Sequence, residues 1–136
     1  DAGKPINSAL EIGQIEGGFV QGQGWLTIEE LKWKSNGQIT TFSPSTYKIP
    51  AVSDMPRKFN VEIYKDGINK EKVVNKAKTT GEPPLMLAMS VFYAIKDAIA
   101  SVDNYRKIPI LDAPATPEKI LMSIKNLSKK QKIYKN

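Results

Sequence analysis

Between residues 85 and 102, apolar side chains recur at intervals of three or four residues, and this pattern constrains the fold more than any other feature of the chain. Such spacing places them on one face of an α-helix, which other parts of a core must cover. Pro83 and Pro84 suit the first turn, because proline has a helical φ and its missing N–H would have no partner there. The sequence predicts a core helix whose apolar stripe comprises Leu85, Ala88, Val91, Phe92, Ile95, Ala98, Ile99 and Val102.

Residues 8–25 also favour a helix, since Ile12, Ile15 and Phe19 follow helical spacing. Interior glycines interrupt this helix, and each costs about 1 kcal/mol relative to alanine. Close approach of the backbone to a ligand, or tight packing on another helix, would compensate for that cost. The glycines concerned are Gly17, Gly18, Gly22 and Gly24.

Alternating segments predict β-strands. Leu31 and Trp33 alternate with lysines, and Asn36-Gly37, the strongest short signal for a hairpin, joins them to residues 38–42. Residues 58–64 alternate in the same way, and the polar loop 65–80 is expected to carry a short strand around Val73 and Val74. The predicted fold class is therefore α+β, with helices packed on a small antiparallel sheet.

The C-terminal part combines a helix with a basic tail. Thr116 is the expected N-cap of a helix that begins at Pro117. Residues 117–136 contain six lysines and one acid, which accounts for +5 of the net charge of +6. Residues 1–128 are expected to form one domain, and residues 129–136 a flexible tail, with binding to an anionic partner as the alternative for the tail.

The composition limits the chemistry that the chain can perform. It contains no cysteine and no histidine, which excludes disulfides, iron–sulfur ligation, the common zinc sites and Ser-His-Asp or Cys-His catalysis from within this chain. Any metal must therefore arrive on an organic cofactor.

The sequence also predicts no membrane span, because no run approaches the roughly 20 apolar residues that a span requires.

Glu82 is the strongest candidate for a catalytic residue. It stands between Gly81 and Pro83, so an extended backbone is expected, because a residue before proline is disfavoured in the α region. The partial positive charge at the start of a helix favours the ionised carboxylate, whereas burial would oppose it. A general base and a purely structural residue at a helix end both remain open on these grounds.

A second candidate is the segment 12–24, in which three glutamines and five glycines occur together. Glutamine amides offer both donors and acceptors to a polycyclic heteroaromatic ligand, and glycines allow it to approach the backbone. The spacing matches neither a dinucleotide-binding fingerprint nor a phosphate-binding loop.

Five phrases occur in the order in which the xanthine dehydrogenase family of molybdenum hydroxylases has them, and the resemblance runs nearly from end to end. It is closest to the bacterial form, in which the molybdenum subunit is separate from the flavin and iron–sulfur subunit. The phrases are Gly13-Gln14-Ile15-Glu16-Gly17, Gly24-Trp25-Leu26-Thr27-Ile28-Glu29-Glu30-Leu31, Pro44-Ser45-Thr46-Tyr47-Lys48-Ile49-Pro50, Gly81-Glu82-Pro83-Pro84-Leu85 and Ala113-Pro114-Ala115-Thr116-Pro117-Glu118.

The resemblance implies roles for three residues. Glu82 corresponds to the general base that activates a molybdenum-bound hydroxide for attack on the purine carbon. Gln14 and the backbone of Gly81 correspond to contacts with the molybdenum cofactor. Residues 1–128 are then expected to be the C-terminal part of the molybdopterin-binding domain.

The resemblance also implies cofactors and partners. Molybdopterin-bound molybdenum belongs to the parent enzyme, and FAD and [2Fe-2S] centres to the partner subunit rather than to this chain. The expected partners are the remainder of the molybdenum subunit, the flavin and iron–sulfur subunit and a purine substrate such as hypoxanthine or xanthine, with neither membrane nor nucleic acid. The location is expected to be cytoplasmic, and the chain alone is expected to be inactive.

The competing hypothesis is a small basic, non-enzymatic module that binds an anionic partner. A nucleic-acid module would interleave aromatic and basic residues, whereas Tyr134 is the only aromatic residue among the lysines of the tail. The ordered phrases favour the enzyme.

Overall fold

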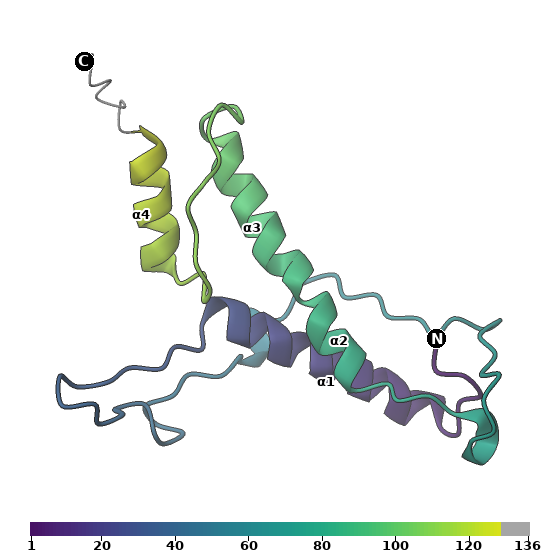
Figure 1. Ribbon diagram of the computed structural model, residues 1–136. Coiled ribbons are helices and arrows are strands. Elements are labelled where there is room, and N and C mark those ends of the chain that lie inside the picture. Colours follow the sequence, from purple (N-terminus) through teal and green to yellow (C-terminus); the bar gives the residue numbers. More distant parts are fainter. Residues whose placement is uncertain (129–136) are drawn as a thin grey trace.

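The computed structural model describes residues 1–128. Its main elements are four α-helices, α1 (Ser8–Thr27), α2 (Glu82–Leu87), α3 (Met89–Ser101) and α4 (Pro117–Ser128), with two short 3-10 helices, η1 (Val52–Asp54) and η2 (Val74–Lys76). Helices α1 and α2 lie against each other, and α3 continues from α2 and leads to α4, which lies beside it (Figure 1). The expected basic tail, residues 129–136, lies outside the described residues.

Helix α1 begins where its sequence supplies an N-cap. The Asn7 Oδ1 accepts hydrogen bonds from the backbone N–H groups of Ala9 and Leu10, at 3.1 and 3.2 Å. These bonds satisfy two donors that the first turn leaves free. The helix predicted over residues 8–25 is thus confirmed and extends to Thr27.

Glycines allow α1 and α2 to touch through their backbones. A Cβ atom on Gly18 would lie 2.3 Å from the Gly81 carbonyl oxygen, and one on Gly22 would lie 2.4 Å from that of Leu85. Ala88, at the junction of α2 and α3, is fully buried beside Gly22. The glycines predicted to permit close backbone approach therefore do so at these two positions.

The long helix predicted over residues 85–102 is divided into α2 and α3 by a turn at Ala88. The apolar stripe of α3 packs partly against α4 and the segment before it. The buried core cluster comprises Ile99, Leu111, Ala115 and Leu127, with Phe92, Ile95, Ile120 and Ile124 packed against it. Thr116 caps α4 as predicted, since its Oγ1 accepts a hydrogen bond from the Lys119 N–H at 3.4 Å.

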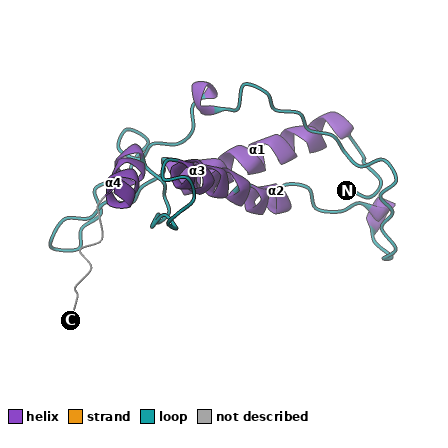
Figure 2. Cartoon of the chain, turned by 90° about the horizontal axis from the view of Figure 1, so that it is seen from above, coloured by secondary structure: helices purple, strands orange, loops and turns teal. Residues whose placement is uncertain are grey.

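The predicted antiparallel sheet is wrong. No strand occurs in residues 1–128 (Figure 2), where only two isolated antiparallel bridges form, Trp33 with Ile39 and Gly3 with Ala77. The turn at Gly37 is present, with φ at 82° and its N–H bonded to the Lys34 carbonyl at 2.9 Å. An isolated hairpin is marginal without a third strand.

The other alternating segments also lack a strand partner. Residues 58–64 instead pack on a helix, because the Phe59 ring lies 5.2 Å, between centroids, from that of Phe19 in α1. The strand predicted around Val73 and Val74 is replaced by η2. An alternating sequence requires only that one face be buried. In residues 58–64, Phe59 packs on α1, and no backbone hydrogen-bond ladder forms.

The expectation that no segment reaches the length and apolarity of a membrane span needs correction. The helical stretch Glu82–Ser101 has 20 residues, and an 18-residue window within it has a mean hydropathy of 1.3 and is 22% buried. Length and composition alone would let it cross a membrane. An apolar helix that packs against other protein has the same length and composition.

Candidate functional site

The three predicted site residues come together at one pocket between α1 and the start of α2. Glu82 is the first residue of α2, Gly81 is the residue before it, and Gln14 lies in the second turn of α1. All three line a pocket of about 600 Å³. Segments that are 68 residues apart in the sequence thus meet at one site.

The backbone at Glu82 differs from the expectation. Gly81 has αR dihedral angles, and Glu82 is already helical, so the prediction of an extended Glu82 is wrong. The α region is disfavoured rather than forbidden for a residue before proline, and Glu82 adopts it where the preceding Gly81 lies against Gly18 of α1. The Glu82 side chain is exposed to solvent.

One face of α1 forms a wall of the pocket. Gln14 is followed at helical intervals by Gly17, Gly18 and Gln21, and Gly13 completes the lining. A Cβ atom on Gly13 or Gly17 would meet no atom within 4 Å, so these positions border open space. A ligand could therefore lie directly on the backbone of α1.

Residues 78–82 form the opposite wall, and backbone pairing holds this segment in place. The Lys78 N–H donates to the Ala2 carbonyl at 3.0 Å, next to the Gly3–Ala77 bridge. The Lys78 ammonium is paired with Asp1. The pocket is therefore lined by one carboxylate, Glu82, and one ammonium, Lys78, together with amide, hydroxyl and backbone groups.

Sequence reasoning missed several of these lining residues. Gln21 belonged to the segment already considered, and its spacing of seven from Gln14 places both on one helical face. Lys78, Thr79 and Thr80 directly precede Gly81 and could have been found from that adjacency. The predicted residues and the missed ones share this single pocket.

The donor set fits an organic cofactor better than a metal ion bound by protein side chains. Within residues 1–128, no group of three or more His, Cys, Asp or Glu side chains could hold a metal. The open face of Gly13 and Gly17, beside the amide of Gln14, fits a flat heterocycle with alternating donors and acceptors, such as a pterin.

A second polar cluster fixes the arm formed by residues 29–50. Glu29 is only 9% exposed and accepts a hydrogen bond of 2.5 Å from the Tyr47 hydroxyl. This hydrogen bond, then burial, then the negative charge of Glu29 raise the pKa of Tyr47 above its ordinary 10.0. The arm lies away from the pocket of Glu82, and the cluster holds it near the end of α1.

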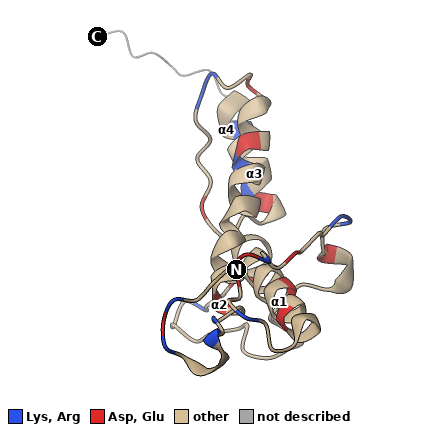
Figure 3. Ribbon diagram, turned by 90° about the vertical axis from the view of Figure 1, so that its right-hand side faces the viewer, with Lys and Arg blue, Asp and Glu red and all other residues tan. Residues whose placement is uncertain are grey.

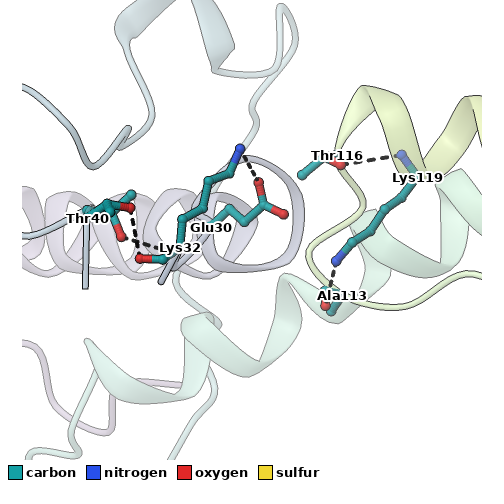
Figure 4. A network of polar contacts seen from close by, with 7 residues as sticks. Glu30, Lys32, Thr40, Ala113, Thr116 and Lys119 are labelled. Atoms are coloured by element: carbon teal, nitrogen blue, oxygen red, sulfur yellow. Dashed lines mark hydrogen bonds and ion pairs between the residues drawn. The ribbon is translucent and has the colours of Figure 1, made fainter. Parts of the chain in front are cut away.

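Polar contacts also order the base of the arm and the start of α4 (Figure 4). The Lys32 ammonium lies 3.2 Å from a Glu30 carboxylate oxygen, and the Thr40 hydroxyl donates to the Lys32 carbonyl at 2.9 Å. The Lys119 ammonium donates to the Ala113 carbonyl at 3.4 Å. None of the five residues lines the pocket of Glu82.

Comparisons with known proteins identify relatives of this chain. The family described as the molybdopterin cofactor-binding domain matches residues 1–56, which include Gln14. Xanthine dehydrogenase/oxidase of Rattus norvegicus is 49% identical over 125 residues, covering 88% of this chain and 9% of that protein. Xanthine dehydrogenase of Oryza sativa subsp. japonica is 44% identical over 142 residues, covering 96% of this chain and 10% of that protein.

A solved structure supports the same assignment. The crystal structure of quinoline 2-oxidoreductase from Pseudomonas putida 86 superposes with a TM-score of 0.75 and 30% sequence identity, covering 92% of this chain and 15% of that one. The sequence comparisons and this structural match thus agree on the class of proteins with a molybdopterin cofactor-binding domain, whose model covers residues 1–56 of the chain. Within this class, the chain belongs to the xanthine dehydrogenase family. It spans about a tenth of the length of these relatives.

Proposed function

We propose that this chain supplies the general base and part of the molybdopterin site of a molybdenum hydroxylase that oxidises purines such as hypoxanthine and xanthine. The observation that carries the proposal is the meeting of Glu82, Gly81 and Gln14 at one pocket whose glycine-lined wall is open. The bound molybdopterin cofactor would supply the oxygen-transfer and electron-accepting chemistry.

Gln14 would hold the cofactor through its side-chain amide, which can donate and accept hydrogen bonds at once. Gly81 would bring its backbone close to the reacting centre, where a side chain would obstruct the site. A Cβ atom on Gly81 would lie 3.2 Å from the Gln14 Oε1, so the two residues are already in close contact. Gly13 and Gly17 would leave room for the pterin ring.

Glu82 would accept the proton of the oxygen nucleophile that attacks the purine carbon. Its carboxylate is exposed and lines the pocket, at the first residue of α2. A base must reach the proton that it removes. The position of Glu82 on the pocket wall supports this requirement.

The proposal extends to the whole enzyme. The remainder of the molybdenum subunit would supply most of the substrate and cofactor walls, and a flavin and iron–sulfur subunit carrying FAD and [2Fe-2S] centres would receive the electrons. We propose the two-subunit arrangement of bacterial enzymes and a cytoplasmic location. These points rest on the family resemblance of the sequence.

No observation favours the alternative of a basic binding module. Four of the 20 basic residues lie in residues 129–136, outside the described part. Along the ribbon of α3 and α4, acidic and basic positions are interspersed (Figure 3). Binding of nucleic acid would require a continuous basic surface.

Substitution of Glu82 tests the proposal in the complete enzyme that contains this chain. Glu82→Gln should preserve folding and molybdenum content, because the side chain is exposed and the amide keeps its shape. Purine turnover should fall by roughly 10² to 10⁴, the range typical of losing a general base. Steady-state kinetics and metal analysis measure the two effects.

A matched control is Glu118→Gln, which changes an exposed glutamate in the first turn of another helix, α4. This variant should turn over at the normal rate. Near-normal turnover by Glu82→Gln with full cofactor would reduce Glu82 to a structural residue at a helix end.

A further inference from the structure

The three glutamines of segment 12–24 fall into two groups in the structure. The Gln23 Nε2 donates to the Asp54 carbonyl at 2.6 Å, so this side chain joins α1 to η1. Gln14 and Gln21 line the pocket instead, and both are exposed. The proposed function uses Gln14 and leaves Gln21 without a role.

Gln21 and Gln14 are separated by two helical turns, or about 10 Å along the axis of α1. Gly17 and Gly18 lie between them on the same face. Gly18 is in contact with the Gly81 carbonyl, whereas Gly17 borders open space. The wall between the two amides is therefore bare helix backbone, with one amide at each end.

This wall carries no charge. The two charged groups of the pocket, Glu82 and Lys78, belong to the opposite wall. A neutral wall with an amide at each end suits a neutral planar ligand with a donor and an acceptor on one edge. Within the described residues, no hydrogen bond engages the Gln21 side chain, so its amide is available to a ligand.

We propose that Gln21 is a second amide contact of this site, which binds the N–H and C=O edge of a fused pyrimidine heterocycle. The inference rests on the proposed function, because it assumes that the pocket receives such a ring. Pterins and purines share this edge. The ligand is therefore either the cofactor or the substrate, and the experiment separates the two.

The test uses the complete enzyme that contains this chain, with the variants Gln21→Leu and Gln21→Glu. Leucine and glutamate both suit a helix, and Gln21 is exposed, so both variants should retain the fold. Leucine removes the donor and the acceptor. Glutamate keeps an acceptor but removes the donor and adds a charge to the neutral wall.

Two readouts separate the ligands. If Gln21 binds the pterin, Gln21→Leu should lower the molybdenum and pterin content per protein after dialysis. If it binds the purine, the cofactor content should remain full and KM should rise by about tenfold with a smaller change in kcat, as expected for one lost hydrogen bond. Gln38→Leu is the matched control, because Gln38 is exposed on the arm and does not line the pocket of Glu82.

Unchanged cofactor content and unchanged KM in Gln21→Leu would overturn the inference. Misfolding of both Gln21 variants would also overturn it, because Gln21 would then be a structural residue. The Glu82 test has a separate outcome: if Glu82→Gln were fully active while Gln21→Leu lost pterin, the proposed base would be wrong and the Gln21 contact would stand.

Discussion

At the scale of single residues, Glu29 and Tyr47 show how the arm is held. Glu29 is nearly buried, and its carboxylate accepts a hydrogen bond from the Tyr47 hydroxyl. The pair depends on a protonated phenol, and accordingly the pKa of Tyr47 lies above 10.0 in the folded protein. The contribution of this hydrogen bond to the free energy of unfolding is therefore fully present below pH 10. It is lost as the pH rises through the pKa of Tyr47 in the folded protein.

Tyr47→Phe should lower the free energy of unfolding by about 1–3 kcal/mol at pH 7, because it leaves a nearly buried carboxylate without its donor. The difference from the wild type should shrink above pH 10, where the phenol of the wild type also ionises. Urea unfolding at several pH values measures both effects. Tyr64→Phe is the control, because Tyr64 is 62% exposed, and an equal loss in both variants would contradict the role of the pair.

At the scale of elements, the packing of α1 on α2 distinguishes two kinds of glycine in one helix. Gly22 faces the Leu85 carbonyl and Ala88 directly, whereas Gly17 faces open space at the pocket. Substitution by alanine should therefore have opposite effects on stability at Gly22 and at Gly17.

Gly22→Ala should destabilise the protein by about 1–3 kcal/mol, because its methyl group would force backbone atoms of the two helices apart. Gly17→Ala should stabilise the chain by up to about 1 kcal/mol through the higher helix propensity of alanine. Thermal unfolding followed by circular dichroism compares the two. Equal effects of both variants would mean that α1 and α2 do not meet as described.

At the scale of the whole molecule, the chain exposes an unusually large surface. Its accessible area is 10760 Å², whereas a compact monomer of 15.1 kDa exposes about 7,100 Å². Large apolar side chains contribute to this surface, among them Phe42, Ile49, Ile108 and Ile110, which are 64–83% exposed. The relatives of this chain are about ten times longer, so more protein is available in them to cover such residues.

The purified 136-residue chain should therefore self-associate, because exposed apolar surface is removed from water on contact. Light scattering at increasing concentration should give a mass above 15.1 kDa. Phe42→Ser together with Ile49→Ser should weaken the association, since both side chains line one apolar pocket on the arm. A monomer at every concentration would contradict the expectation.

The sequence alone determined the features that depend on neighbouring residues. Periodicity identified α1 and the helical region of α2 and α3, capping by Thr116 identified the start of α4, and the ordered phrases identified the family. Capping and helical periodicity involve atoms only a few residues apart, so a short stretch of sequence contains the information. The turn at Asn36-Gly37 is local in the same sense.

Only the tertiary structure decided the features that depend on distant segments. Residues 58–64 have the pattern of a strand, but a strand needs a partner, and the described chain offers them a helix instead. Glu82 is helical despite the proline that follows, at the point where Gly81 lies against Gly18 of α1. The position of Gln21 on the pocket wall, opposite Lys78 and Glu82, likewise arises only when α1 and α2 meet, because contacts between segments more than 50 residues apart are not encoded in local spacing.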